Sequence, residues 1–286
     1  MERKFLKIFF ILTAICFIGG CKGAINTEEV SENSEIQDAL GENTDQKILT
    51  FSLSGFSEMG KRSWDLKGDS ADILTNNVVL LENVLGHSYT KENTITLTAD
   101  KGEFDQNKSN LLLRDNVVGI ADDGAKVLTD VLNWDATKRE IDTDAFVRII
   151  RENMEATGDG AFGQPDLKQM QLKKNVTVEL KPATVITCDG ALEVDTLNNS
   201  AFFNDNVIVI DERGKIWADK IEVYFDPKAK TIKKVFAKGN VKILRGENMT
   251  YSEEAIYEAD SKIMTLTGRP RLVLYSKEEL NAFTGN

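Results

Sequence analysis

The stretch from Lys215 to Asp226, KIWADKIEVYFD, contains the pattern that decides the fold. Its first part places Ile216 and Ala218 on one face of an extended chain. The alternation then slips by one residue, so that Ile221 and Val223 share a face. Such a slip in a two-residue period indicates a bulge or corner, at which the strand bends and keeps its apolar side inside. The stretch therefore predicts one long strand that is bent in its middle.

The same slip occurs between residues 97 and 104, so the bend is not confined to one place. A polar stretch follows each bent strand, at residues 105–108 and 226–230, and these stretches are rich in Asp, Asn, Lys and Pro. Such residues are typical of tight turns. Each unit is therefore predicted to be a strand, a turn and a second strand.

Two sequence marks recur about every 30 residues. One is an Asn-Val pair, and the other is a two-residue mark, mostly ending in Asp, that precedes it. Two independent marks in phase indicate six or seven similar units. The Asn-Val pairs lie at 83–84, 116–117, 175–176, 206–207 and 240–241, with 145–147 at the vacant step, and the second marks are Ala71-Asp72, Ala99-Asp100, Thr129-Asp130, Thr157-Gly158, Cys188-Asp189, Ala218-Asp219 and Ser252-Glu253.

The units predict an all-β protein in which bent strands stack along one axis. A parallel β-helix and an antiparallel folded-over sheet, a β-jellyroll with a V-shaped groove, both fit the repeat. The hairpin turns favour the antiparallel form. A stack of this kind leaves an open sheet edge at each end, which is either capped or paired with another chain.

Composition excludes several classes of function. The chain has 286 residues, of which 41% are hydrophobic and 28% charged, so it is long enough for one large or two modest globular domains. Its net charge of -11 disfavours a nucleic-acid partner. A single histidine makes a multi-histidine metal site impossible and argues against histidine-based acid–base catalysis. No cofactor is expected.

The N-terminus has the features of an export signal. Residues 1–20 combine a basic start with a short apolar run and end in Gly19-Gly20, directly before Cys21. The segment resembles a bacterial lipoprotein signal, which implies that Cys21 is the lipid anchor. An uncleaved signal anchor is the alternative, although the run is short for a spanning helix. Residues 21–48 are polar and predict a flexible tether, so the body is expected outside the cytoplasm.

Inward-facing apolar residues are either simple core or the lining of a lipid groove, and the sequence leaves both possibilities open. Core is the more ordinary role for any one of them. The candidates for the lipid groove are Leu97, Phe104, Val117, Trp134, Val147, Val176, Val178, Val207, Val209, Ile221, Val223, Val241 and Ile243.

Other conspicuous residues have structural interpretations. The repeated aspartates Asp100, Asp130, Asp189 and Asp219 recur once per unit, so we expect them to accept backbone N–H bonds at corners rather than act in catalysis. We expect His87 at the surface and Cys188 as a small buried residue without a disulfide partner. Ser276 and Glu279 form a capping box, which predicts a short helix over 277–286.

The ordered repeats resemble a known family. Residues 64–71 (WDLKGDSA), 97–105 (LTADKGEFD) and 111–117 (LLLRDNV) are similar to LptC, a membrane-anchored periplasmic component of lipopolysaccharide export. The resemblance continues through Thr157-Gly158 and Leu172 to Val176. From about Val185 the units resemble LptA/OstA-like proteins, the soluble bridge of the same pathway. The implied domains are 49–183, LptC-like, and 184–276, LptA/OstA-like.

The resemblance implies a carrier and not an enzyme. Acyl chains of lipopolysaccharide would lie in the apolar groove, and jellyrolls would join edge to edge by strand pairing. The implied partners are the inner-membrane ABC transporter subunits, near residues 49–75, and another bridge protein, near 240–275. The membrane would be contacted through the lipid anchor, with the inner membrane favoured. The main rival is a structural β-solenoid lipoprotein without lipid cargo. An enzyme acting on envelope glycans has only the aspartate row in its support.

Overall fold

The computed structural model describes residues 44–56, 60–89, 94–122, 124–135, 137–138, 140–164, 169–181, 183–228 and 231–274. The predicted signal peptide, Cys21, most of the tether and the predicted C-terminal helix lie outside the described residues. Within them, the structure contains no helix long and apolar enough to cross a membrane.

Seventeen antiparallel strands form one sheet, which confirms the predicted all-β, folded-over architecture. The strands are β1 (Thr44–Phe56), β2 (Arg62–Leu74), β3 (Val78–Tyr89), β4 (Thr94–Asp105), β5 (Asn110–Ala121), β6 (Lys126–Asp135), β7 (Glu140–Arg151), β8 (Met154–Gln164), β9 (Gln169–Leu180), β10 (Thr184–Cys188), β11 (Leu192–Asp195), β12 (Ser200–Asp211), β13 (Gly214–Phe225), β14 (Ile232–Arg245), β15 (Asn248–Glu258), β16 (Ile263–Thr267) and β17 (Arg271–Val273).

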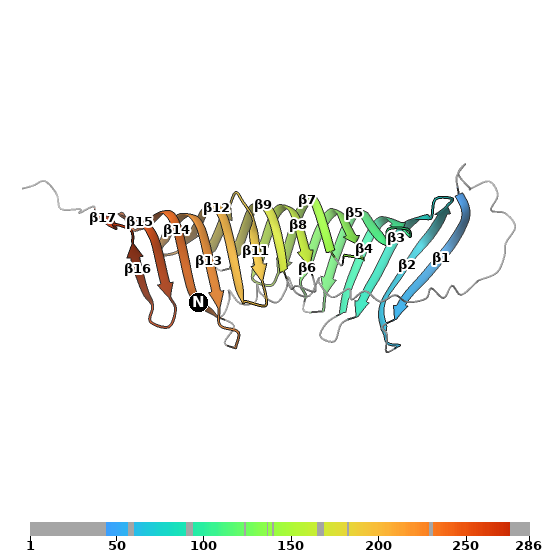
Figure 1. The fold of residues 1–286 in the computed structure, drawn as a ribbon, viewed down its shortest axis with the longest axis horizontal. Helices are drawn as coiled ribbons and strands as arrows, with labels where there is room; N and C mark the ends of the chain where they lie inside the picture. Colours follow the sequence, from blue (N-terminus) through green and yellow to red (C-terminus); the bar gives the residue numbers. More distant parts are fainter. Residues whose placement is uncertain are drawn as a thin grey trace, which may run out of the picture.

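The sheet is a meander, in which each strand pairs with its neighbours in sequence. β10 and β11 together fill one position between β9 and β12, and β16 and β17 together fill the last position beside β15. Figure 1 shows the strands side by side along the long axis, from β1 at one end to β17 at the other. Among the described strands, the sheet edges are therefore β1 and the β16/β17 pair.

Most strands bend at the predicted corners. The pairing register shifts there, for example between Trp217 and Lys220 where β13 meets β14. The asparagine of every Asn-Val mark has a left-handed backbone, which asparagine tolerates better than most residues. The φ angles are 51° at Asn83, 52° at Asn116, 52° at Asn175, 50° at Asn206 and 48° at Asn240.

Each of these asparagines also donates its side-chain N–H to an aspartate at the corner of the strand before it in the sheet. The pairs are Asn83 with Asp69, Asn116 with Asp100, Asn175 with Asp159, Asn206 with Asp189 and Asn240 with Asp219, at 2.6 to 2.9 Å. The corner role of Asp100, Asp189 and Asp219 is thus confirmed, but the donor is an asparagine side chain rather than a backbone N–H. In two units the second mark named the wrong residue: the acceptors are Asp69 instead of Asp72, and Asp159 instead of Gly158.

The corner of β7 differs from the others. Phe146 occupies the asparagine position and is 55% exposed, so Asp130 has no matching asparagine. The β6–β7 register is interrupted between Leu128 and Asn133. Thr143 completes this corner instead, because its hydroxyl donates to the Val131 carbonyl at 2.6 Å and accepts the Ala145 N–H at 3.1 Å.

The bends divide the sheet into two limbs that face each other. We call the halves ending in the β7–β8, β9–β10, β12–β13 and β14–β15 hairpins the first limb. The halves ending in the β4–β5, β11–β12, β13–β14 and β15–β16 hairpins form the second limb. The apolar core lies between the limbs, in one cluster toward the N-terminal end and a longer one toward the C-terminal end.

One boundary differs from the sequence prediction. β1 begins at Thr44, so the last five residues that we assigned to the tether are strand. The reason is pairing, because Gln46 and Ile48 lie opposite Ile73 and Ala71 of β2.

Candidate functional site

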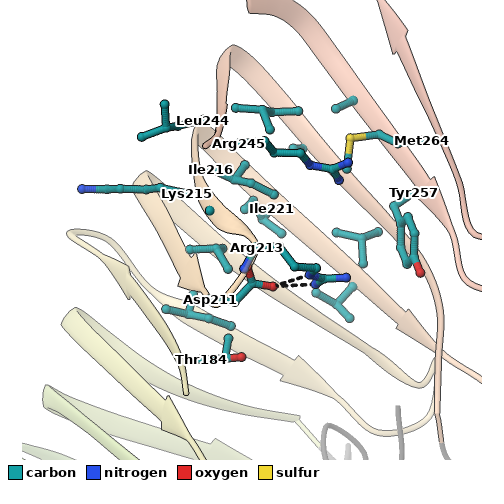
Figure 2. Close-up of a pocket in the computed structure, with 18 of the residues that line it drawn as sticks. Thr184, Asp211, Arg213, Lys215, Ile216, Ile221, Leu244, Arg245, Tyr257 and Met264 are labelled. Atoms are coloured by element: carbon teal, nitrogen blue, oxygen red, sulfur yellow. Dashed lines mark hydrogen bonds and ion pairs between the residues drawn. The ribbon is translucent and has the colours of Figure 1, made fainter. Parts of the chain in front are cut away.

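A cavity of about 190 Å³ lies between the two limbs in the C-terminal half (Figure 2). It is bounded by strands β10, β12, β13, β14, β15 and β16, and its inner lining is apolar. The first limb contributes Ile186, Val209, Ile216 and Ile243, and the second contributes Phe203, Ile221, Val223, Val235, Ala237, Ala255, Tyr257 and Met264.

A second cavity of about 30 Å³ continues toward β8. Ile186, Phe203 and Val223 line both cavities, so the two spaces lie in series along the sheet axis. Its other lining residues are apolar and come from β8 to β13: Met154, Ala156, Leu172, Val178, Leu192, Val194, Ala201 and Phe225. The two neighbouring apolar spaces together therefore extend from β8 to β16.

The strand register explains why the interior is hollow here. Phe203, Ile221, Ala237 and Ala255 lie opposite one another on adjacent strands, on the inner face of the second limb. Side-chain volume falls along this row, from phenylalanine and isoleucine to two alanines. Because the backbone spacing between strands stays constant, the smaller side chains leave space between the limbs.

The predicted groove residues all lie in the core, but only some of them border a cavity. Val178, Val209, Ile221, Val223 and Ile243 line the two spaces. Val117, Val147, Val176, Val207 and Val241 are at most 2% exposed and lie within the packed core. Leu97, Phe104 and Trp134 are half-buried against the N-terminal core cluster. Contact with acyl chains stays a prediction for all thirteen.

Several lining residues were missed by the sequence analysis. Phe203, Ile186 and Val235 follow the same alternation, so strand parity could have identified them. Ala237 and Ala255 gave no signal, because the space beside an alanine depends on the distance to the opposite limb. The charged residues at the cavity mouth, Asp211, Arg213 and Arg245, belong to hairpin tips whose proximity no periodicity predicts.

The mouth combines two arginines with one carboxylate. Arg213 donates from Nε and Nη2 to Oδ2 of Asp211, at 2.8 and 2.5 Å, while the Asp211 Oδ1 accepts the Arg213 backbone N–H at 2.8 Å. Arg213 and Arg245 are exposed and also line the cavity, so the cavity reaches the surface at these tips. The site is therefore an apolar slot with a polar rim.

Buried carboxylates lie on the outer face of the sheet and not in the cavity. Glu222 is 8% exposed and accepts hydrogen bonds from Lys238 at 2.8 Å and from the Tyr224 hydroxyl at 3.2 Å. Burial alone would raise its pKa, but Lys238 and Tyr224 stabilise the carboxylate, and its pKa is lowered from the ordinary value. Glu222 is thus a structural ion-pair residue.

Asp65 has the corresponding position near the N-terminal end. It is 5% exposed and is bonded to the Tyr89 hydroxyl at 2.6 Å and to Nδ1 of His87 at 2.9 Å. Burial opposes ionisation, but these hydrogen bonds prevail and lower its pKa. His87 is half-buried and bound to Asp65, rather than a simple surface residue.

Cys188 is a free thiol, 3% exposed, as expected for a small buried residue. Burial raises its pKa to about 11, which makes the thiolate scarce at neutral pH. Among the described residues no group of His, Cys, Asp or Glu side chains could hold a metal ion. The arrangement suits the binding of hydrocarbon, because its lining offers apolar surface.

Comparison with known proteins assigns the chain to a family. Residues 8–181 match the family model "LptC: Lipopolysaccharide-assembly, LptC-related". The chain belongs to the LptC-related lipopolysaccharide-assembly family. Residues 185–286 match a second model, "LptA/(LptD N-terminal domain) LPS transport protein". The chain thus joins an LptC-type part to an LptA-type part, and the matches meet at the β9–β10 hairpin. The sheet continues across this junction, because β9 pairs with both β10 and β11.

A solved structure also resembles the LptC-related chain. It is LptH, the LptA-homologous periplasmic component of the lipopolysaccharide transport device of Pseudomonas aeruginosa. The two are 13% identical, the match covers 64% of this chain and 95% of LptH, and the TM-score is 0.22. No curated protein matches the chain.

Proposed function

We propose that the protein is a periplasmic, membrane-tethered carrier of the lipopolysaccharide transport bridge, without enzymatic activity. Acyl chains would occupy the apolar space between the limbs, while the sugar head stays in water. The single observation that carries this proposal is the pair of neighbouring apolar spaces between β8 and β16, in a chain of a lipopolysaccharide-assembly family.

The energetics of the slot support a carrier. Burial of hydrocarbon contributes roughly 0.8 kcal/mol per CH₂, so several methylenes suffice for binding without any polar anchor. Ile186, Val223 and their neighbours in the two spaces offer similar aliphatic surfaces. An acyl chain would then bind with similar free energy at successive positions. Transport requires this, because a single tight site would hold the lipid in place.

We assign the two sheet edges to two partners. The β1 edge, within residues 44–75, would pair with the periplasmic domain of the inner-membrane ABC transporter. The β16/β17 edge, within 240–275, would pair with the next jellyroll of the bridge. Leu272 supports the second assignment, because it lies in register with the inner-face residues Thr250 and Ile243 and yet is 59% exposed. A partner strand would cover it and extend the apolar interior.

We also propose that Cys21 carries the lipid anchor and that residues 184–276 act as the LptA-like part of the bridge. Metabolic labelling with an alkyne-tagged fatty acid tests the anchor. The label should disappear in Cys21→Ala and persist in Cys16→Ala. Equal labelling of both variants would exclude Cys21 as the acylated residue.

Photo-crosslinking in cells tests the cargo. A photoreactive residue at Ile221, which lines the cavity and is 4% exposed, should form an adduct with lipopolysaccharide. The matched control is Lys220, the neighbouring residue on the outer face, where Nζ lies 5.2 Å from the Phe202 ring centroid. Adducts at 221 only would support the carrier.

The rival function is a structural β-solenoid lipoprotein. It predicts no lipid adduct at Ile221 or at Val209, Val223 and Ile243 in folded, expressed protein. That outcome would overturn the carrier proposal, because these positions all face the same apolar space.

A further inference from the structure

We propose that the β12–β13 and β14–β15 hairpin tips form a binding site for the anionic head of an acylated lipid whose chain enters the cavity. The ligand class is a lipid phosphate, and Arg213 and Arg245 are the recognising residues. This inference rests on the proposed function and adds to it the polarity and the orientation of the cargo: the head lies at the first-limb rim, and the chain points between the limbs.

The backbone brings the two arginine-bearing tips together. Lys215 lies opposite Leu244, so the β12–β13 tip and the end of β14 are adjacent in the sheet. Gly214 has a φ of 146°, and a Cβ there would collide with the Leu244 carbonyl. Only glycine permits this close approach of the two tips, which carry Arg213 and Arg245.

The two arginines differ in how much of their charge is engaged. Asp211 binds Arg213 through two of the five guanidinium N–H groups and leaves the others available. Arg245 is exposed and has no ion-pair partner in the part of the chain that the structure describes. In Figure 2 both side chains extend toward the Tyr257 and Met264 side of the cavity.

The neighbouring charges do not form a competing rim. Lys215 extends the other way in Figure 2, and its Nζ lies 4.7 Å from the Trp217 ring centroid. Among the residues that the structure describes, Asp211 is the one acidic residue that lines the cavity, and Arg213 already binds it. Glu212 and Glu247 belong to the same tips but do not line the cavity.

An apolar slot with a guanidinium at its mouth selects amphiphiles with anionic heads. Guanidinium groups bind phosphate oxygens through charge-assisted hydrogen bonds with fixed fork geometry, and two adjacent arginines can share one phosphate. A nonionic head would lack the charge-assisted part of these hydrogen bonds. The site is thus specific for the charge of the head and tolerant of the chain.

Binding of two probes of equal chain length to the full-length protein, measured by calorimetric titration, tests the proposal. The probes are dodecyl phosphate and dodecyl maltoside, each below its micellar concentration. Arg245→Gln should lower the affinity for dodecyl phosphate about fivefold, because one exposed charge-assisted contact is lost. The affinity for dodecyl maltoside should stay unchanged. The matched control, Lys242→Gln, removes an exposed cation from the outer face of the same strand and should change neither.

A cavity-filling variant separates this proposal from the proposed function. Ile221→Trp should abolish binding of both probes, and Ala255→Leu is a second such variant if the first is poorly folded. If the cavity-filling variant binds neither probe, but Arg245→Gln changes the affinity for both probes or for neither, the cavity binds hydrocarbon and the head site is overturned. If filling the cavity changes neither probe, the carrier function itself is overturned.

The source of the lipid phosphate follows from a crosslink in cells. Thr184 lines the cavity at the first-limb rim. A photoreactive residue there should capture a lipopolysaccharide phosphate region, and its yield should fall in the Arg213→Gln, Arg245→Gln double variant. Capture of phospholipid alone would keep the phosphate site and reject lipopolysaccharide as its ligand. Undiminished lipopolysaccharide capture by the double variant would overturn the assignment of the arginines.

Discussion

The two ends of the sheet share one backbone plan but differ inside. Between β2 and β6 the core is filled by large side chains, among them Leu81 and Leu113, which are 2% and 1% exposed. Between β12 and β15 the equivalent space contains a cavity of about 190 Å³. The same bent strands therefore enclose different sets of side chains at the two ends.

Side-chain volume at a few inner positions decides between the two outcomes. Leu81, Gly102, Leu113 and Leu132 form a row in the N-terminal part, where Leu81 packs over the glycine. The corresponding C-terminal row contains two adjacent alanines, at 237 and 255, between Ile221 and Leu266. The comparison teaches that a carrier interior is made by leaving volume out of an otherwise ordinary core.

Truncation in the filled region should have the largest effect. We expect Leu113→Ala to lower the free energy of unfolding by about 3 kcal/mol, because it creates a cavity in a packed core. Ile221→Ala, beside an existing cavity, should cost about half as much, since its side chain has fewer packing partners. Urea unfolding followed by circular dichroism measures both. Equal losses would remove the distinction between the filled and the hollow region.

Enlargement tests the same comparison in the opposite direction. Leu113→Phe should destabilise the protein by about 2 kcal/mol, because overpacking forces strain on the neighbours. Ile221→Phe should cost less than about 1 kcal/mol, because the added atoms enter free space. The readout is the urea midpoint of each variant against wild type. A larger loss for Ile221→Phe would contradict the cavity.

The corners provide a third comparison. Asn206→Ala removes the 2.7 Å bond to Asp189 and puts a residue that tolerates a φ of 50° less well than asparagine at this corner, so we expect a loss of about 1 kcal/mol in the free energy of unfolding. Asn206→Gly keeps the backbone freedom and should lose less. Phe146→Ala, at the corner without an asparagine, should change stability by less than about 0.5 kcal/mol. Thermal unfolding of the three variants ranks them.

Acid should act on both regions through their buried carboxylates. The pKa values of Asp65 and Glu222 are lowered in the folded state, so their stabilisation is present above the ordinary values of 3.8 and 4.5 and is lost as pH falls below them. Glu222→Gln should lower the free energy of unfolding by about 1 kcal/mol at pH 7. It should also make that free energy fall less steeply as the pH is lowered. Unfolding from pH 7 to pH 3 checks this. An unchanged profile in Glu222→Gln would exclude its contribution.

Much of the fold was accessible from sequence because its signals are local. The slip in alternation around Ala218 predicted the corner, and the Asn-Val marks predicted the repeat of about 30 residues. The aspartate acceptors were predicted only in part. The repeated mark pointed to Asp72, whereas the residue that accepts the hydrogen bond from Asn83 is Asp69. Local patterns do not specify which side chain crosses to the neighbouring strand.

The candidate site was less accessible. Val223 and Ile243 could be placed on the inner face by parity, but parity does not distinguish Val223, which borders a cavity, from Val207, which is 0% exposed. That distinction depends on the space between limbs. Arg213 and Arg245 lie 32 positions apart and meet only through the hairpin register, which no single repeat reveals.

The meander also fixes a length. Seventeen strands fill fifteen positions, because β10 shares one with β11 and β16 shares one with β17. At a strand spacing of ~4.8 Å the sheet spans roughly 70 Å, and each further hairpin would add about 10 Å. Because each hairpin pairs only with its neighbours, duplication or deletion of a 30-residue unit would change the reach of the protein in equal steps without redesign of the rest.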